Sequence, residues 1–291
     1  MRRGHPRDDG QAASPGRLLV CATPIGNLGD VTMRVLDALR EADMIEAEDT
    51  RVTRRLLARY DIATPLEPYH AKNLDRRTKQ VLDRIAAGDT VALVSDAGTP
   101  GVSDPGARLV EECLDAGLPV DVLPGPSAIV TALVASGLPT HAFYFGGFLP
   151  RKAGERARRL RRLADLDATL LFYESPGRTA ATLATLAEAF PGRSGAMARE
   201  LTKIHQEVDR GTLDELAARM AQRELKGEVV LLVGPPAERS PRPAFDAVEL
   251  RARVAELVSA GMSRRDAVRA VADESGVPRN DVYQASLRSG V

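Results

Sequence analysis

The chain has 291 residues, and its 40 Lys and Arg balance its 40 Asp and Glu, so overall charge does not indicate a nucleic-acid partner and any basic surface must be local. Apolar residues make up 44% of the chain, which is enough for a core, and the length favours two domains. No apolar run approaches the roughly 20 residues of a membrane span. The two cysteines are typical of buried thiols in a reducing compartment such as the cytoplasm.

The first half of the chain alternates short apolar runs with amphipathic stretches. Residues 1–16 are basic without an apolar segment, and we expect a disordered tail there. Strands are expected at 17–22, 44–47, 64–69, 91–94 and 120–123, and helices at 32–41, 52–60 with Thr50 as cap, 75–87, after Gly106, and 129–136. This repeated order of strand and helix predicts a parallel sheet with right-handed crossovers.

Polar loops follow several of these strands. The largest spans 95–106, where Gly, Pro, Asp, Ser and Thr follow the apolar strand 91–94. Such a loop lets a ligand approach the backbone, because Gly has no side chain in the way. Ser127 precedes a helix whose first N–H groups are free. Because ligands of open α/β sheets bind at the carboxyl ends of strands, the loops predict one shared site.

The second half carries an aromatic strand at 143–150 and then a cationic helix at 151–166. Seven cations on that helix indicate either a solvated face or a patch that contacts RNA phosphate. Further strands are expected at 168–173, 195–198 and 227–233, with helices at 179–190 and 213–225. The Pro-rich residues 235–244 read as a linker, and 245–291 as a small helical domain. For this domain a helical cap on the sheets is favoured over a helix-turn-helix.

Seven motifs occur in an order that resembles a known family: Ala22–Asp30, Ala47–Arg51, Ser95–Gly106, Pro124–Ala128, Gly147–Pro150, Glu174–Pro176 and Arg199–Lys203. Together they resemble the tetrapyrrole methylase superfamily and, within it, the ribosomal RNA small subunit methyltransferase I family. Gly177 and Gln206 depart from the family pattern, which often has His and an acidic residue there.

The resemblance implies two α/β domains, at 17–125 and 126–234, with S-adenosylmethionine held in the cleft between them. It implies transfer of the methyl group to the ribose 2′-oxygen of a cytidine in the decoding region of 16S ribosomal RNA. The residues it assigns to the cofactor are Pro24, Ile25, Asp96, Ala97, Gly98, Thr99, Val102, Ser127, Ala128 and Tyr173. Glu174 is expected beside Tyr173 on the second-domain side of the cleft.

The acceptor hydroxyl must lose its proton as the methyl group arrives. The candidates at strand ends are Lys203, Glu200, Glu174 and Asp104, with Asp49 as a further carboxylate. We favour Lys203, with a pKa lowered by desolvation beside a sulfonium and with Glu200 orienting it. A structural salt bridge between Lys203 and Glu200 is the alternative. No metal-ligand cluster and no G-x-S-x-G elbow occur in the sequence.

Two other functions remain open at this point. One is a methyltransferase of the same superfamily that acts on a tetrapyrrole, whose carboxylates would also bind the cationic helix. The other is a non-catalytic RNA-binding protein with a vestigial cleft. The expected partner is 16S ribosomal RNA within the small ribosomal subunit, and the superfamily implies a homodimer.

Overall fold

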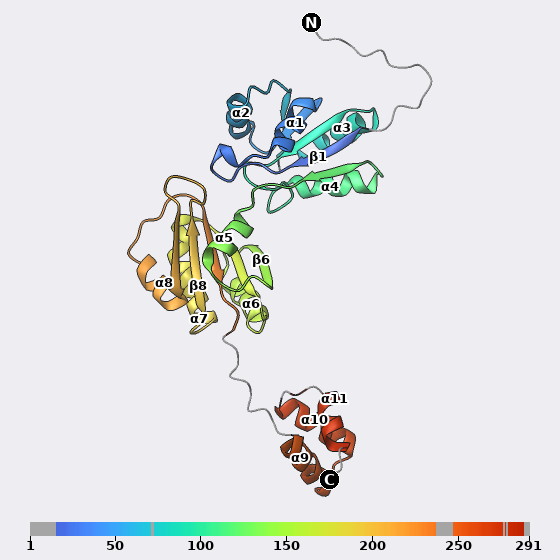
Figure 1. Ribbon diagram of the computed structural model, residues 1–291, viewed down its shortest axis with the longest axis vertical. Helices are drawn as coiled ribbons and strands as arrows, with labels where there is room; N and C mark the ends of the chain where they lie inside the picture. The colour runs from blue at the N-terminus through green and yellow to red at the C-terminus, as the bar shows by residue number, and fades with distance from the viewer. Residues whose placement is uncertain (1–15, 71–72, 237–246, 276, 278, 288–291) are drawn as a thin grey trace. The chain divides into compact units, whose positions relative to one another are not determined.

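The computed structural model describes residues 16–70, 73–236, 247–275, 277 and 279–287 (Figure 1). The chain divides into two compact units, one ending at Pro235 and the other beginning at Pro236. Residues 1–15 of the predicted tail and 237–244 of the predicted linker lie outside the described residues.

The first sheet is built from strands that all run parallel. They are β1 (Arg17–Cys21), β2 (Met44–Ala47), β3 (Leu66–Pro68), β4 (Thr90–Val94) and β5 (Val120–Leu123). Their order across the sheet is β3-β2-β4-β1-β5, and each neighbouring pair is parallel. The predicted parallel sheet is confirmed, and its carboxyl edge collects the polar loops.

Helices cover both faces of this sheet. On one face α1 (Met33–Glu41) and α2 (Thr50–Arg59) pack on apolar side chains of β1, β2 and β4. On the other, α3 (Leu74–Ala86) and α4 (Gly106–Asp115) pack on β1 and β4. The prediction that Thr50 caps α2 is wrong, because Asp49 is the cap and its side chain accepts the Arg51 N–H at 2.8 Å. A carboxylate suits this position, since it also complements the helix dipole.

The second sheet is mixed. Its strands are β6 (Phe143–Phe148), β7 (Thr169–Glu174), β8 (Ser194–Arg199), β9 (Glu207–Thr212) and β10 (Val229–Val233), in the order β6-β7-β10-β8-β9. Only β6 and β7 run parallel. Strand β9 was not predicted, because its sequence is polar and contains Gly211. It forms at the edge of the sheet, where its side chains are only partly buried and polar residues are tolerated.

The second sheet also has a helix layer on each face. The apolar helix α5 (Ala128–Ser136) packs on one face, and α6 (Ala153–Leu163), α7 (Thr179–Ala189) and α8 (Leu213–Met220) pack on the other. Helices α6 and α8 are shorter than the ranges predicted from the sequence. Ile25 of the first domain lies in the same apolar cluster as α5. The two sheet domains therefore share buried contacts next to the polar loops.

The C-terminal unit contains α9 (Ala247–Ser259), α10 (Arg264–Ser275) and α11 (Arg279–Leu287). Leu250, Val254, Val268, Val271 and Val282 are among the side chains that form its own buried core. Ser263 caps α10, since its hydroxyl accepts the Asp266 N–H at 3.2 Å. None of the helices in the described part of the chain is long and apolar enough to cross a membrane.

Candidate active site

Loops from three strands of the first sheet meet at its carboxyl edge. Thr23, after β1, and Gly98, after β4, exchange backbone hydrogen bonds at 2.8 and 3.0 Å. The Asp49 N–H, after β2, donates to Oδ1 of Asp96 at 2.9 Å. The convergence that the sequence predicted is therefore confirmed for these three loops.

Gly98 lies where these loops meet the segment after β5. Its backbone has φ +78°, a region that favours glycine, and a β-carbon there would lie 3.7 Å from both Ile25 Cγ2 and the Pro126 carbonyl oxygen. Ser127 follows as the cap of α5, and its hydroxyl accepts the Val130 N–H. The structure thus brings the three predicted cofactor segments, 24–25, 96–99 and 127–128, into one group.

The predicted cofactor residues differ in their access to solvent. Pro24, Ile25 and Gly98 are buried, Thr99, Ser127, Ala128 and Tyr173 are half-buried, and Asp96, Ala97 and Val102 are exposed. Tyr173 packs in the apolar cluster that contains Ile25 and Ala128. The Phe145 and Phe148 rings lie 4.9 and 5.7 Å from the Tyr173 ring, between ring centroids. The sequence predicted an aromatic strand at 143–150 but assigned neither Phe145 nor Phe148 to the site, so this aromatic group was missed.

Two carboxylates at or near residues 95–106, which we call the central loop, have raised pKa values. Burial raises the pKa of Glu48, and the charges of Asp96 and Asp104 raise it further. Burial also raises the pKa of Asp96, against the hydrogen bond that it accepts from Asp49. A cation bound beside Glu48 and Asp96 would lower both pKa values, because it would favour the charged carboxylates. Among the described residues no group of His, Cys, Asp and Glu is placed to hold a metal ion.

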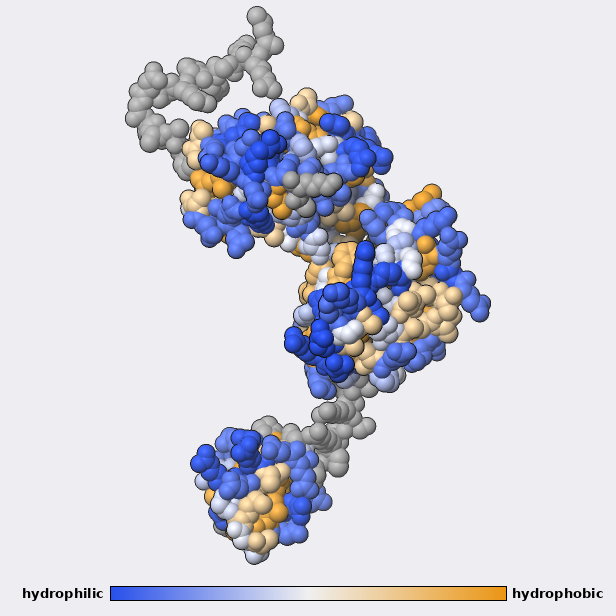
Figure 2. Space-filling view, turned by 180° about the vertical axis from the view of Figure 1, so that it is seen from behind, coloured by the Kyte–Doolittle hydropathy of each residue, from blue (hydrophilic) through white to orange (hydrophobic). Residues whose placement is uncertain are grey.

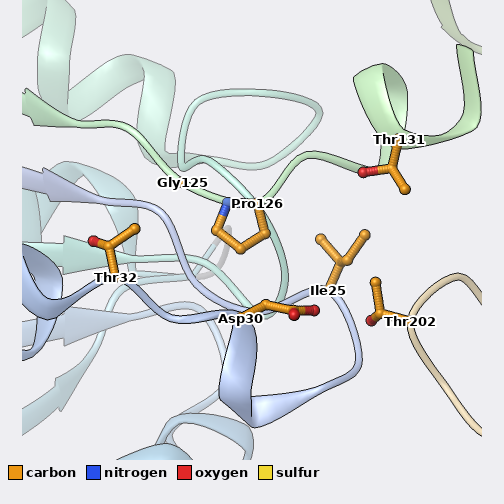
Figure 3. Close-up of a pocket in the computed structure, with 7 residues that line it drawn as sticks. All are labelled: Ile25, Asp30, Thr32, Gly125, Pro126, Thr131 and Thr202. Atoms are coloured by element: carbon orange, nitrogen blue, oxygen red, sulfur yellow. The ribbon is translucent and has the colours of Figure 1, made fainter. Parts of the chain in front are cut away.

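A pocket of about 390 Å³ opens beside these loops (Figure 3). It is lined by Ile25, Asp30, Thr32, Gly125, Pro126, Thr131 and Thr202. Ile25 and Pro126 are also the residues that approach Gly98, so the pocket and the predicted cofactor loop share a wall. In Figure 3 the Asp30 carboxylate points toward the side of the pocket where Ile25 and Thr202 lie.

Of the residues that line the pocket, the sequence predicted only Ile25. Asp30 and Thr202 stand inside motifs that were recognised, yet neither was selected. Thr131 lies one helical turn beyond the recognised Pro124–Ala128 motif. Asp30 forms no side-chain hydrogen bond or ion pair with any described residue, which distinguishes it from the predicted carboxylates.

The loop after β8 closes the pocket from the second domain. The Asn27 N–H donates to the Thr202 hydroxyl at 3.0 Å, and a β-carbon on Gly26 would lie 2.5 Å from Lys203 Cγ. Glu200 and Thr202 have φ +51° and +64°, which non-glycine residues rarely adopt. We call this contact between residues 26–27 and 202–203 the interdomain clamp.

Lys203 does not have the acidity expected of a base. Its ammonium donates to Glu200 at 2.8 Å and to Glu228 at 3.2 Å. Partial burial lowers the pKa of Lys203, but the hydrogen bonds and charges of Glu200 and Glu228 outweigh this effect and raise it overall. The expected lowering is therefore wrong. The structural salt bridge between Lys203 and Glu200, left open as an alternative, is present.

The other predicted carboxylates are also engaged in local contacts. Glu174 is buried and accepts from the Thr182 hydroxyl on α7 at 2.7 Å, so it lies on the opposite face of β7 from Tyr173. Its predicted place in the cleft is wrong, because successive residues of a strand alternate between faces. Asp104 accepts from the N–H groups of Gly101 and Gly106 at 2.9 and 2.7 Å, which fixes the central loop.

Two family models match the chain. "Tetrapyrrole (Corrin/Porphyrin) Methylases" matches residues 17–217, and "RsmI C-terminal HTH domain" matches 246–289. The second match favours the helix-turn-helix over the helical cap that we preferred from the sequence. In the structure, the matched range contains α9, α10 and α11.

Curated relatives match almost the whole chain. Proteins named "Ribosomal RNA small subunit methyltransferase I" from Synechocystis sp. and Mycobacterium tuberculosis H37Rv are 44% and 46% identical, over 94% and 95% of this chain. The matches cover 98% and 96% of those proteins. Among solved structures, the methyltransferase CobJ matches with a TM-score of 0.59 at 29% identity, covering 76% of this chain and 95% of that one. A Thermus thermophilus uroporphyrin-III C-methyl transferase complexed with S-adenyl homocysteine matches at 0.54 and 23%, covering 75% and 97%.

Proposed function

Since the chain belongs to the ribosomal RNA small subunit methyltransferase I family of the tetrapyrrole methylases, we propose that it methylates 16S ribosomal RNA with S-adenosylmethionine as donor. The finer proposal is that the acceptor is the ribose 2′-oxygen of a cytidine in the decoding region. The observation that carries the assignment is the wall of Ile25 and Pro126, which the predicted cofactor loop shares with the 390 Å³ pocket. We assign the side of the cofactor loop to the donor and the pocket to the acceptor.

The residues around Gly98 suit S-adenosylmethionine. The bare backbone at Gly98 admits close approach, and the aromatic group of Tyr173, Phe145 and Phe148 offers a surface for an adenine ring. The carboxylates of Glu48 and Asp96 complement a positive sulfonium, whose electrophilic methyl group is the chemistry that the cofactor supplies. We therefore keep the ten cofactor residues of the sequence prediction as the proposed donor site and add Phe145 and Phe148.

The pocket supplies the groups for the acceptor. As the acceptor oxygen gains its bond to the methyl carbon, the sulfur–carbon bond of the donor would break and leave a neutral thioether. The O–H bond of the acceptor also breaks, and its proton must be taken up. We assign this proton to the carboxylate of Asp30, which points into the pocket and is free of other contacts among the described residues. The hydroxyls of Thr131 and Thr202 line the same pocket and can orient a ribose through hydrogen bonds. Lys203 and Glu200 hold the interdomain clamp rather than take the proton.

The proposal extends to the assembly and the location of the enzyme. Helix α5 has no charged residue, yet Val130 and Val134, one turn apart, are 52% and 68% exposed. A helix that is apolar on all sides is normally buried, so we assign the outer face of α5 to a second copy of the chain. A Val134→Glu variant that stays dimeric in sedimentation would contradict this. The substrate is proposed to be rRNA within the small subunit, in the cytoplasm.

Tritium transfer tests the function directly. Labelled S-adenosylmethionine is incubated with the enzyme and with small subunits from a strain that lacks the activity, and the rRNA is digested to nucleosides. Label is expected in 2′-O-methylcytidine. Label in a base would refute the proposed acceptor atom, and transfer to a tetrapyrrole but not to RNA would favour that alternative. Absence of cofactor binding in calorimetry would favour the non-catalytic one.

A further inference from the structure

A second pocket, of about 340 Å³, lies on α6 and shares no lining residue with the first pocket. It is lined by Tyr144, Glu155, Arg158, Arg159, Arg162 and Leu163. Three guanidinium groups face a single carboxylate, which also has Lys152 at 3.5 Å. Figure 2 shows strongly hydrophilic side chains gathered on the second sheet domain, on the side of α6. The pocket therefore carries an excess of positive charge and suits an anion.

The three arginines of this pocket are not equivalent. Arg159 donates to the carbonyl oxygens of Gly146 and Phe148, which holds its guanidinium in the wall of the pocket. Arg158 and Arg162 are exposed and have no hydrogen bond or ion pair within the described part of the chain. Arg159 thus has a structural role, and the groups free to bind a ligand are Arg158 and Arg162.

The spacing of the free arginines favours a bound anion. Arg158 and Arg162 are four residues apart on α6, where like charges repel each other and destabilise the helix. The helix dipole favours Arg162, in the last turn, but not Arg158. A phosphate between the two guanidinium groups would remove the repulsion and accept paired hydrogen bonds, for which the planar guanidinium is well suited.

The backbone segment that Arg159 binds connects the α6 pocket to the proposed active site. The pairing of β6 with β7 shifts register between Phe145 and Phe148, and Arg159 binds carbonyls in this irregular segment. A β-carbon on Gly147, at its centre, would lie 3.7 Å from the Ser103 hydroxyl of the central loop. Phe148 contacts the ring of Tyr173. A ligand on α6 is therefore only one short segment away from residues proposed to hold the cofactor.

We propose that Arg158 and Arg162 bind a backbone phosphate of the RNA substrate, next to the nucleotide that is methylated, with Tyr144 as the wall of this subsite. The inference rests on the proposed function, because it takes RNA as the substrate. The net charge of the chain is zero, so a strand of RNA needs local cation pairs of this kind to hold it beside the pocket.

The test compares two double variants. Arg158→Ala with Arg162→Ala removes the free pair. Arg151→Ala with Arg161→Ala removes one cation just before α6 and one on it, neither of which lines the pocket. Binding of small ribosomal subunits is measured over a range of salt, together with methyl-transfer kinetics on the same subunits. For the first variant we expect the KM for RNA to rise about tenfold, with unchanged kcat and cofactor Kd. The slope of log K against log salt should fall by about 0.7–0.9 per lost phosphate contact.

The control variant should change KM less than threefold. An equal rise in both variants would show diffuse attraction and overturn the subsite, as would an unchanged salt slope in the first. Replacing both residues by Lys should keep the salt slope but not the full affinity, since lysine lacks the paired donors. RNA binding that depends on Arg158 and Arg162 in an enzyme that transfers no methyl group would refute the proposed function and leave the subsite standing.

Discussion

Replacement of Lys203 by Ala, Met or Arg distinguishes a residue that holds the interdomain clamp from one that takes a proton. The Lys203 ammonium contacts Glu200 and Glu228, and its stem packs against Gly26. Ala removes both the charge and the stem, Met removes the charge and keeps the stem, and Arg keeps both. We expect the loss of stability to increase with the number of these contacts that a variant removes, and the rate of the chemical step to change little.

The expected loss can be worked out from the exposure of the partners. The side chains of Lys203, Glu200 and Glu228 are 29%, 18% and 71% exposed. Partly exposed pairs contribute about 0.2–1 kcal/mol each. Loss of both pairs therefore lowers the free energy of unfolding by about 1 kcal/mol in Lys203→Met, and lost packing brings Lys203→Ala to about 2 kcal/mol. For a unit of this size the Tm of Lys203→Ala should fall by about 4–8 °C, while Lys203→Arg should stay near wild type.

The pH dependence has a definite sign. The folded pKa of Lys203 is raised, so its stabilisation is fully present below the unfolded value and disappears as pH rises through the folded value. The difference in Tm between wild type and Lys203→Met should persist at pH 7–9 and shrink above about pH 10.4. At pH 7 a lysine with that ordinary pKa is deprotonated in only about one molecule in 2,500, and a raised pKa makes this fraction smaller.

The assay is thermal unfolding together with single-turnover methyl transfer at saturating RNA and cofactor. We expect the turnover rate of Lys203→Arg to stay within about threefold of wild type. A hundredfold loss of rate in Lys203→Arg, with unchanged Tm, would refute the structural role and restore Lys203 as the base.

Three further predictions each concern a single residue. Gly98→Val should abolish cofactor binding in calorimetry, whereas Gly117→Val, at a similar φ of +68° but in open space, should cause the same kind of strain and leave binding intact. Asp30→Asn should lower kcat by about 10² or more without changing cofactor affinity, whereas the control Asp37→Asn, at an exposed position, should leave kcat unchanged. Equal kcat values for Asp30→Asn and the wild type would remove Asp30 from the mechanism. Hydrogen bonds from Arg223 and Arg199 lower the pKa of Glu207 to about 2. The stabilisation that Glu207 contributes is therefore present above its unfolded pKa and is lost as pH falls between about 5 and 2. In acid denaturation, the stability of Glu207→Gln should fall less steeply over this pH range than that of the wild type.

The first sheet could be predicted almost completely because its central strands β1, β2 and β4 are buried on both faces. Val91–Val94 and Leu18–Cys21 are continuous apolar runs, and the polar residues that follow them mark the ends of the strands. The same pattern located the loops around Gly98 that the structure brings together. Strand β9 carries no such signal, because an exposed edge tolerates polar residues.

The catalytic residues were harder to predict because their roles depend on contacts between distant segments. The sequence cannot show that Thr182 engages Glu174, or that Glu228 adds a second carboxylate to Lys203. It also cannot show which carboxylate in a motif is left without a partner. Asp30 could be selected only after the contacts of the other candidates were known. The division into domains at 17–125 and 126–234 stays a prediction, although each range contains one complete sheet.

The position of β10 in the middle of the second sheet bears on how the protein folds during synthesis. All five residues of β10 are buried, and the strand lies between β7 and β8 although it is the last of the sheet to leave the ribosome. At about 5–20 residues per second, the roughly 90 residues from Phe143 to Val233 take about 5–18 s to appear. The first sheet is complete by Leu123 and can fold at once. During that interval β7 and β8 lack the strand that joins them, so the nascent chain exposes unpaired strand edges that a chaperone would recognise.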